Sequence, residues 1–114
     1  MLDELLHNTD LFLLYGTLLT DKQRECLSMH LLDDFSMSEI GEDMGISRQA
    51  AYDLIRRSIK SMEEYEAKLG FLKKRKQVED ILESVYDDVN KLDGVDAEMK
   101  KSLLNRLDTC IKHD

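Results

Sequence analysis

The sequence of 114 residues predicts an all-α protein with a single domain. It contains no proline and only five glycines, while leucine, glutamate and lysine are abundant, a composition that favours helices. Apolar residues make up 42% of the chain and recur at helical spacing, and no alternating run of β-branched residues indicates a strand. A chain of this length is expected to form one domain, or a small domain with an extension.

The first predicted helix, from about residue 3 to residue 18, is apolar on nearly every face. It is therefore expected either deep in the core or against a partner chain. The next helix begins after Thr20, because "TDKQ" places Thr20 and Gln23 at the two positions of a capping box. "SMSE" repeats this pattern with Ser36 and Glu39, and predicts the start of a third helix.

Glycines and caps define the remaining helices. Gly45 ends the short third helix, at a position where the backbone commonly needs a positive φ. Ser47 caps a fourth helix that continues without a break until Gly70 stops it. A fifth helix is expected over residues 71–92 and a sixth over about 96–112, each with one apolar stripe.

The stretch from Ser38 to Lys60 fits a helix-turn-helix. Two helices that cross steeply need a small residue at the crossing and a glycine in the turn, and Gly41 and Gly45 supply them. The inward positions of the motif are all apolar: Ile40, Met44, Ile46, Ala51, Leu54 and Ile55. The predicted fold is therefore a helix-turn-helix between an apolar N-terminal helix and a C-terminal helical pair.

The motif divides the chain into two predicted parts. Residues 1–70 form a helix-turn-helix domain whose recognition helix spans about 47–69, and residues 71–114 form a helical extension that packs with it as one domain. The formal net charge is −8, but residues 45–60 carry a local charge of +3, whereas residues 81–100 carry −4. The overall acidity therefore does not exclude a face that binds nucleic acid, although it weakens non-specific attraction.

The outer face of the recognition helix is the predicted DNA-binding site. Arg48 and Gln49 lie at its N-terminal end, where arginine can pair with guanine and glutamine with adenine. Asp53 opposes binding unless it pairs with an arginine on the next turn. The whole predicted set is Ser47, Arg48, Gln49, Tyr52, Arg56, Arg57 and Lys60. The alternatives are a hairpin with a solvated face and a module that contacts protein.

Residues 19–70, "LTDKQRECLSMHLLDDFSMSEIGEDMGISRQAAYDLIRRSIKSMEEYEAKLG", resemble region 4 of bacterial sigma factors. The capping boxes, the "GISRQA" turn and the "EEYEAKLG" end more closely resemble the YlxM family of small bacterial DNA-binding proteins, and this likeness covers nearly the whole chain. The resemblance implies a helix-turn-helix with a regulatory role and no catalytic residues. Because the family's genes usually neighbour those of the signal recognition particle GTPases, it also implies a link to that pathway.

Two residues depart from the pattern of this family. Such motifs usually carry alanine at the position of Gly41, and the glycine is expected to cost about 0.5–1 kcal/mol of helix stability without breaking the packing. Valine is commoner at the position of Ala51, so a lighter core is expected beneath the second helix of the motif.

A zinc site is one further candidate, since Cys26 and His30 are four residues apart, and Cys110 and His113 are three apart. Together they would make a Cys2His2 set, but the spacing is not that of a known finger, so ordinary thiols and solvated imidazoles are the favoured interpretation.

Two charge clusters remain. "KKRK", residues 73–76, either binds phosphates or forms a solvated first turn, where cations oppose the helix dipole. Glu83, Asp87 and Asp88 suggest a divalent-metal site or an acid–base pair, but without a supporting motif a solvated face is favoured.

The sequence as a whole predicts a non-enzymatic regulatory protein without a cofactor or metal. No P-loop, dinucleotide fingerprint or catalytic triad is recognisable, and no stretch suggests a membrane span or a secretory signal. The two distant cysteines favour a reduced, cytoplasmic protein. We expect a C2 homodimer that inserts its recognition helices into the DNA major groove. The alternative is an adaptor that binds a protein or RNA component of the signal recognition particle.

Overall fold

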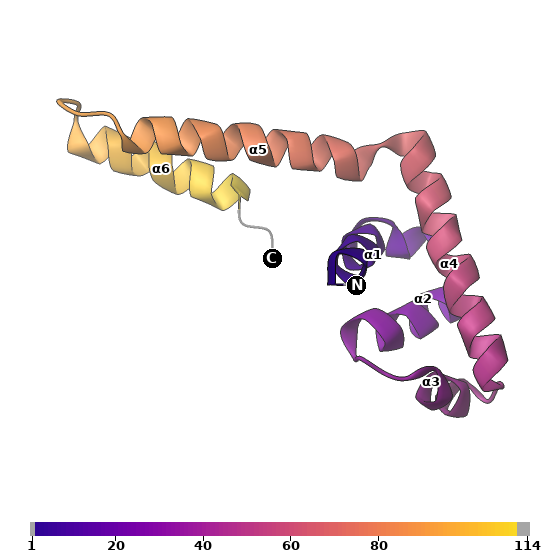
Figure 1. Ribbon diagram of the computed structural model, residues 1–114. Helices are drawn as coiled ribbons and strands as arrows, with labels where there is room; N and C mark the ends of the chain where they lie inside the picture. The colour runs from indigo at the N-terminus through magenta and orange to yellow at the C-terminus, as the bar shows by residue number, and fades with distance from the viewer. Residues whose placement is uncertain (1, 112–114) are drawn as a thin grey trace. The chain divides into compact units, whose positions relative to one another are not determined.

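The structure, a computed structural model, describes residues 2–111 and is helical throughout, with no strand in that range (Figure 1). The prediction of an all-α fold is therefore confirmed. Its elements are α1 (Leu2–Tyr15), a 3₁₀ turn (Gly16–Leu18), α2 (Asp21–Leu27), a π-helical turn (Ser28–Leu32), α3 (Met37–Met44), α4 (Arg48–Leu69), α5 (Phe71–Asn90) and α6 (Ala97–Ile111).

The chain divides into two compact units, and the boundary lies between Leu72 and Lys73. The first unit contains α1 to α4 and the first residues of α5; the second contains the rest of α5 and α6. The packing of both parts into one domain stays a prediction.

Both predicted capping boxes are present. The Gln23 backbone amide donates to Thr20 Oγ1 at 3.2 Å, and the Thr20 amide donates to Gln23 Oε1 at 3.0 Å. At the start of α3 the Glu39 amide donates to Ser36 Oγ at 3.1 Å, and the Ser36 amide donates to Glu39 Oε1 at 2.9 Å. Each box satisfies amides that have no partner inside the helix, so these starts are fixed by residues three positions apart.

The predicted glycine stops are also confirmed. Gly45 has a φ of 69° and Gly70 a φ of 65°, in the left-handed region that residues with a Cβ rarely adopt. Between them, the Ser47 hydroxyl accepts a hydrogen bond from the Ala50 amide at 3.0 Å and begins α4. The recognition helix therefore runs from Arg48 to Leu69, close to the predicted range.

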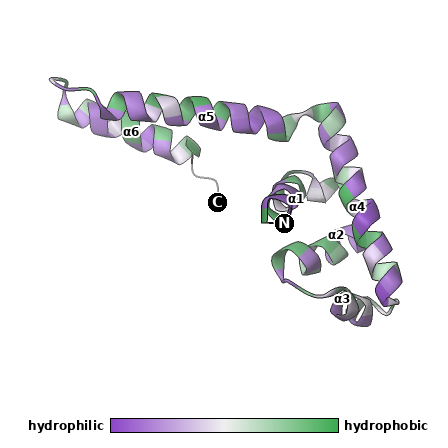
Figure 2. Ribbon diagram, viewed as in Figure 1, coloured by the Kyte–Doolittle hydropathy of each residue, from purple (hydrophilic) through white to green (hydrophobic). Residues whose placement is uncertain are grey.

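The core of the first unit lies where α4 packs against α1, α2 and α3. Helix α4 carries both hydrophobic and hydrophilic residues along its length (Figure 2), and its buried residues fall on one side, as in an amphipathic helix. The largest side chains that are fully buried there are Tyr15, Leu11, Leu27, Ile40 and Met62. The first helix is buried on one side only, because Leu2, Leu6 and Leu13 are exposed.

A polar network around the buried Tyr15 side chain joins the end of α4 to the start of α5. The Tyr15 hydroxyl donates to Glu66 Oε1 at 2.6 Å, and accepts a hydrogen bond from the Phe71 amide at 3.2 Å. The Leu72 amide donates to the same Glu66 oxygen at 2.9 Å. Burial, and then the bond to Glu66, raise the pKa of Tyr15 above its ordinary value. This network fixes the chain on either side of the Gly70 stop.

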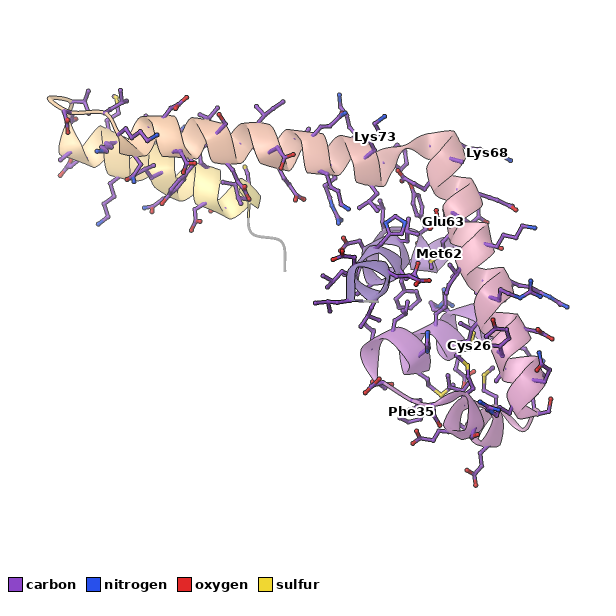
Figure 3. The ribbon with its side chains drawn as sticks, viewed as in Figure 1. Cys26, Phe35, Met62, Glu63, Lys68 and Lys73 are labelled. Carbon is purple, nitrogen blue, oxygen red and sulfur yellow. The ribbon has the colours of Figure 1, made fainter. Side chains whose placement is uncertain are left out.

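A second link between α1 and α4 lies at the surface. His7 Nε2 lies 2.9 Å from Glu63 Oε1, on the part of α4 between Met62 and Lys68 that Figure 3 labels. Because both side chains are partly exposed, this contact contributes less than the network around Tyr15.

The second unit is a hairpin of α5 and α6. Lys100 Nζ donates to the Leu92 carbonyl at 2.8 Å, and Glu83 and Tyr86 of α5 line one depression together with Asp108 and Ile111 of α6. No side chain between residues 73 and 111 is fully buried. Exposed apolar residues there are Val78, Ile81, Val85, Leu92, Val95 and Met99.

The helices of this hairpin are slightly shorter than predicted. Helix α5 ends at Asn90 instead of residue 92, and α6 spans Ala97–Ile111. Lys112, the last residue of the predicted sixth helix, lies outside the described residues. Within residues 2–111, no helix combines the length and the apolar character that crossing a membrane requires.

Candidate nucleic-acid interface

Helices α3 and α4 meet at the predicted helix-turn-helix, and the backbone of the turn between them lies against Gly41 of α3. The Ile46 amide donates to the Gly41 carbonyl at 2.8 Å. A Cβ on residue 41 would lie 2.7 Å from the Ile46 carbonyl oxygen and 3.2 Å from the Ser47 carbonyl carbon. A side chain at this position would therefore force the turn to move, so the glycine relieves a backbone contact in addition to weakening the helix, which the sequence analysis did not include.

One of the six predicted inward residues does not point inward. Ile46 is 36% exposed, because its backbone fills the crossing next to Gly41 and its side chain is left at the surface of the turn. Of the other five, Ile40, Ala51 and Ile55 are buried, while Met44 and Leu54 are partly buried and pack against the core.

The outer side of α4 carries six of the seven predicted DNA-binding residues. Arg48, Gln49, Tyr52, Arg56, Arg57 and Lys60 are all exposed. At 3.6 residues per turn they span about half of the helix circumference. The buried residues Ala51, Ile55, Ser58 and Met62 occupy the opposite side. The fold thus gathers the six side chains on one solvent-facing surface, which we call the α4 outer face; their role in DNA binding stays a prediction.

The seventh residue, Ser47, has a structural task. Its hydroxyl accepts the Ala50 amide at 3.0 Å, so the oxygen is already engaged in capping the helix. Close to it, a depression of about 340 Å³ is lined by Met37, Arg48, Gln49 and Tyr52. This depression lies at the N-terminal tip of α4, the part of a recognition helix that meets base edges.

Asp53 engages two residues of the α4 outer face. An Arg56 guanidinium nitrogen lies 3.7 Å from Asp53 Oδ1, so the aspartate pairs with an arginine on the next turn, the condition that the sequence analysis left open. Gln49 Nε2 also donates to Asp53 Oδ1, at 3.3 Å, a contact that the sequence interpretation did not include. The aspartate therefore holds side chains that a DNA partner would require, in addition to placing a negative charge among them.

Positive charge is confined to a small part of the first unit. Up to Leu72 the chain has seven lysines and arginines against fourteen aspartates and glutamates. Four of the seven, Arg48, Arg56, Arg57 and Lys60, belong to the α4 outer face. Non-specific attraction of this unit to a polyanion is therefore weak, and a local contact must supply most of the affinity.

The four residues weighed as a zinc site, which the sequence analysis disfavoured, do not all lie within the described range. Cys26 is buried, its thiol donates to the Gln23 carbonyl at 3.1 Å, and burial raises its pKa. Cys110 is exposed, and His113 lies outside the described residues. Among residues 2–111, the structure places no three His, Cys, Asp or Glu side chains where they would hold a metal ion.

The two charge clusters of the second unit are at its surface. In the "KKRK" run, the three lysines are exposed and Arg75 Nε lies 3.3 Å from Glu79 Oε1. The acidic side chains Glu83, Asp87 and Asp88 line an open depression together with Lys91. Phosphate binding by the basic run stays a prediction.

Comparisons with known proteins agree with the motif. A family model described as "Putative helix-turn-helix protein, YlxM / p13 like", UPF0122, matches residues 2–102. A UPF0122 protein of Halalkalibacterium halodurans is 44% identical over 109 residues, which cover 96% of this chain and 98% of the relative. A UPF0122 protein of Geobacillus kaustophilus is 41% identical over 108 residues, which cover 95% of this chain and 97% of the relative. A UPF0122 protein of Caldanaerobacter subterraneus is 46% identical over 87 residues, which cover 76% of this chain and 74% of the relative.

Proposed function

Because the chain belongs to the UPF0122 family of YlxM / p13-like helix-turn-helix proteins, we propose that it is a regulatory protein that binds duplex DNA. The observation that carries the proposal is the α4 outer face, where four cationic side chains, a glutamine and a tyrosine are exposed beside a helix-turn-helix crossing. The proposed role requires no catalysis and no cofactor. A protein that acts on bacterial chromosomal DNA works in the cytoplasm.

In this mechanism the N-terminal part of α4 enters the major groove. Arg48 reaches guanine and Gln49 adenine, and each bidentate pair contributes about 1–3 kcal/mol of discrimination. Arg56, Arg57 and Lys60 contact phosphates, which set the position of the helix but carry no sequence information. On binding, Gln49 and Arg56 exchange Asp53 for the DNA.

The salt dependence of binding tests this mechanism. Three phosphate contacts predict a slope of log K against log salt of about −2.7 per protomer. Affinity should then fall about 40-fold between 50 mM and 200 mM salt. The measurement is fluorescence anisotropy of a labelled duplex, titrated with the full chain at several salt concentrations.

A matched pair of variants localises the contact. Lys60→Ala should reduce the slope by about one. Lys68→Ala removes the same charge from an exposed position of the same helix, about 12 Å further along the axis, and should leave the slope unchanged. Equal slopes for both variants would contradict binding through the α4 outer face.

Homodimerisation belongs to the same proposal, and the α5–α6 hairpin supports it. The second unit spans 42 residues, close to the size below which a chain needs oligomerisation or another support to fold. From residue 73 to residue 111 no side chain is fully buried, although each helix carries an apolar stripe. A second copy of the hairpin would cover these stripes, and a symmetric pair suits an operator with two half-sites.

Sedimentation equilibrium of the full chain tests the dimer. The chain should sediment at twice its 13.3 kDa mass at micromolar concentration. Ile81→Gln, at a position that is 63% exposed on the apolar stripe of α5, should shift the equilibrium toward the monomer. Glu83→Gln places the same side chain on the polar side of the same helix and should not. A wild-type protein that remains at 13.3 kDa would disprove dimerisation.

A second candidate function is a non-enzymatic adaptor for the signal recognition particle, and one observation favours it. Acidic side chains outnumber basic ones by seven in the unit that carries the helix-turn-helix, which suits a basic protein partner better than DNA. On this alternative the chain binds a protein or RNA component of the particle. Capture of the particle's RNA or protein, together with the absence of any saturable binding to duplex DNA, would favour the adaptor.

A further inference from the structure

A cavity of about 470 Å³ lies in the first unit behind the recognition helix. Its walls come from α1, the π-helical turn after α2, α3 and α4, four elements that are distant in sequence. The apolar part of its lining consists of Leu5, Leu31, Met37, Ile55 and Ile59. This volume and this mostly apolar lining are typical of sites for small molecules, which are usually few in a protein and formed before the ligand binds.

Two polar side chains of the lining make no hydrogen bond to any residue from 2 to 111. Asn8 is only 8% exposed, and within residues 2–111 its side-chain amide makes no hydrogen bond. His30, in the π-helical turn, is half-buried and likewise makes no side-chain hydrogen bond in the described range. The Asn8 amide lines the open cavity, so it is available to hydrogen-bond a ligand or solvent there.

The polar groups also define the charge of a fitting ligand. Burial lowers the pKa of His30, against an opposing effect of Asp34, so its imidazole is neutral at physiological pH. The two charged residues of the lining, Glu4 and Arg56, have opposite signs. An uncharged molecule therefore suits the cavity better than an anion or a cation. The Asn8 side chain has an NH2 donor beside a carbonyl acceptor, so it can form two hydrogen bonds with a ring that carries an acceptor beside a donor.

The cavity is next to the α4 outer face. Tyr52 and Arg56 line it and also belong to that face, and Met37 and Tyr52 line both this cavity and the depression below Arg48 and Gln49. A molecule in the cavity would contact residues that the proposed DNA complex uses.

We propose that this cavity binds a small, uncharged heteroaromatic molecule that carries an adjacent hydrogen-bond donor and acceptor, and that its binding alters the affinity for DNA. The ring packs among Leu31, Ile55 and Ile59, its polar edge bonds the Asn8 amide, and it contacts Tyr52 and Arg56 on the side of the recognition helix. The regulatory half of this inference rests on the proposed DNA binding, whereas the binding site itself does not.

Two matched probes test the site. 7-Azaindole has an N–H donor beside a ring-nitrogen acceptor, whereas indole has nearly the same shape and the donor alone. Each is titrated to millimolar concentration into the isotope-labelled full chain, and NMR follows the side-chain amide of Asn8 and the methyl groups of Ile55 and Ile59. We expect saturable shifts at all three residues, with 7-azaindole binding about tenfold more tightly than indole.

Two variants of Asn8 test the recognition. Asn8→Leu keeps the branched shape of the side chain and removes the amide, so 7-azaindole should lose its tenfold advantage over indole. Asn8→Gln keeps the amide and should retain the preference. A thermal melt of each variant checks that it is folded. If Asn8→Leu does not fold, the relative affinities of 7-azaindole and indole for the wild-type chain still test whether the cavity recognises an adjacent donor and acceptor.

The outcomes separate the site from its regulatory role. No saturable shift with either probe, or equal affinities that Asn8→Leu leaves unchanged, would overturn the site. Shifts of the same signals with protein concentration, before any probe is added, would mean that a second copy fills the cavity, and would also overturn it. For regulation, saturating 7-azaindole should change the dissociation constant for a duplex in the wild type but not in Asn8→Leu. An unchanged constant in the wild type overturns the coupling alone, and a chain that binds no duplex under any condition overturns the proposed function but not the site.

Discussion

Replacing Gly41 by alanine should destabilise the protein, although the same change inside a helix ordinarily stabilises it. On helix propensity alone alanine is better by about 1 kcal/mol. The structure opposes this gain, because the new Cβ would lie 2.7 Å from the Ile46 carbonyl oxygen and 3.2 Å from two atoms of Ser47. These are backbone atoms of the turn, so no side-chain rotation relieves the contact.

The magnitude follows from the two opposing effects. To restore ordinary contact at 3.4 Å the Ile46 carbonyl must move away from residue 41 by about 0.7 Å, which weakens the 2.8 Å hydrogen bond from the Ile46 amide to the Gly41 carbonyl. Forced overpacking of this kind costs about 1–3 kcal/mol. After subtraction of the propensity gain of about 1 kcal/mol, Gly41→Ala should lower the free energy of unfolding by up to about 2 kcal/mol.

Urea unfolding followed by circular dichroism measures this difference. Ser38→Ala, at an exposed position of the same helix, is the matched control and should be neutral or slightly stabilising. If Gly41→Ala gains the full propensity difference of about 1 kcal/mol, the tight contact between Gly41 and the turn after α3 is wrong. An unchanged slope against urea in both variants would show that only stability has changed.

Three further predictions concern single side chains. Tyr15→Phe removes the hydrogen-bond donor to Glu66 and should lower the free energy of unfolding by about 2 kcal/mol in urea titrations. As pH rises above about 10, through the raised pKa of Tyr15, the wild type should lose this stabilisation, whereas the variant has none of it to lose. Asp53→Asn removes a negative charge beside the DNA and frees Gln49, so duplex affinity should rise about fivefold in anisotropy titrations, and a fall would contradict the proposed orientation of α4. Burial lowers the pKa of His30, so the neutral imidazole stabilises the fold fully above about pH 6.5, and this contribution is lost as pH falls through the pKa of the folded state. In thermal melts, His30→Gln should therefore lose less stability than the wild type on acidification.

The helices and their ends could be predicted because their signals are short-range. Thr20 with Gln23 and Ser36 with Glu39 lie three residues apart, so a capping box can be recognised without any knowledge of the fold. The positive φ of Gly45 is likewise a property of a single residue in a helix stop.

The features that escaped prediction depend on contacts between elements. Spacing identified Gly41 as a small residue at a crossing, but only the distance to the Ile46 carbonyl shows that a Cβ would force the turn to move. The outward side chain of Ile46 follows from the same backbone contact. Asn8 and His30 are 22 positions apart in the sequence, and no periodicity indicates that α1 and the π-helical turn bring them to one cavity.

Selection of bound sequences from a random duplex library tests the central claim, DNA readout by the α4 outer face, most directly. The full chain should enrich duplexes with two inverted half-sites about 34 Å apart, and Arg48→Ala or Gln49→Ala should relax the sequence at one position of each half-site. The signal recognition particle RNA is captured in a parallel arm as the competing ligand. If no duplex is enriched above the background of the Arg48→Ala variant, while the RNA is retained, the chain does not read DNA and the proposed function is wrong.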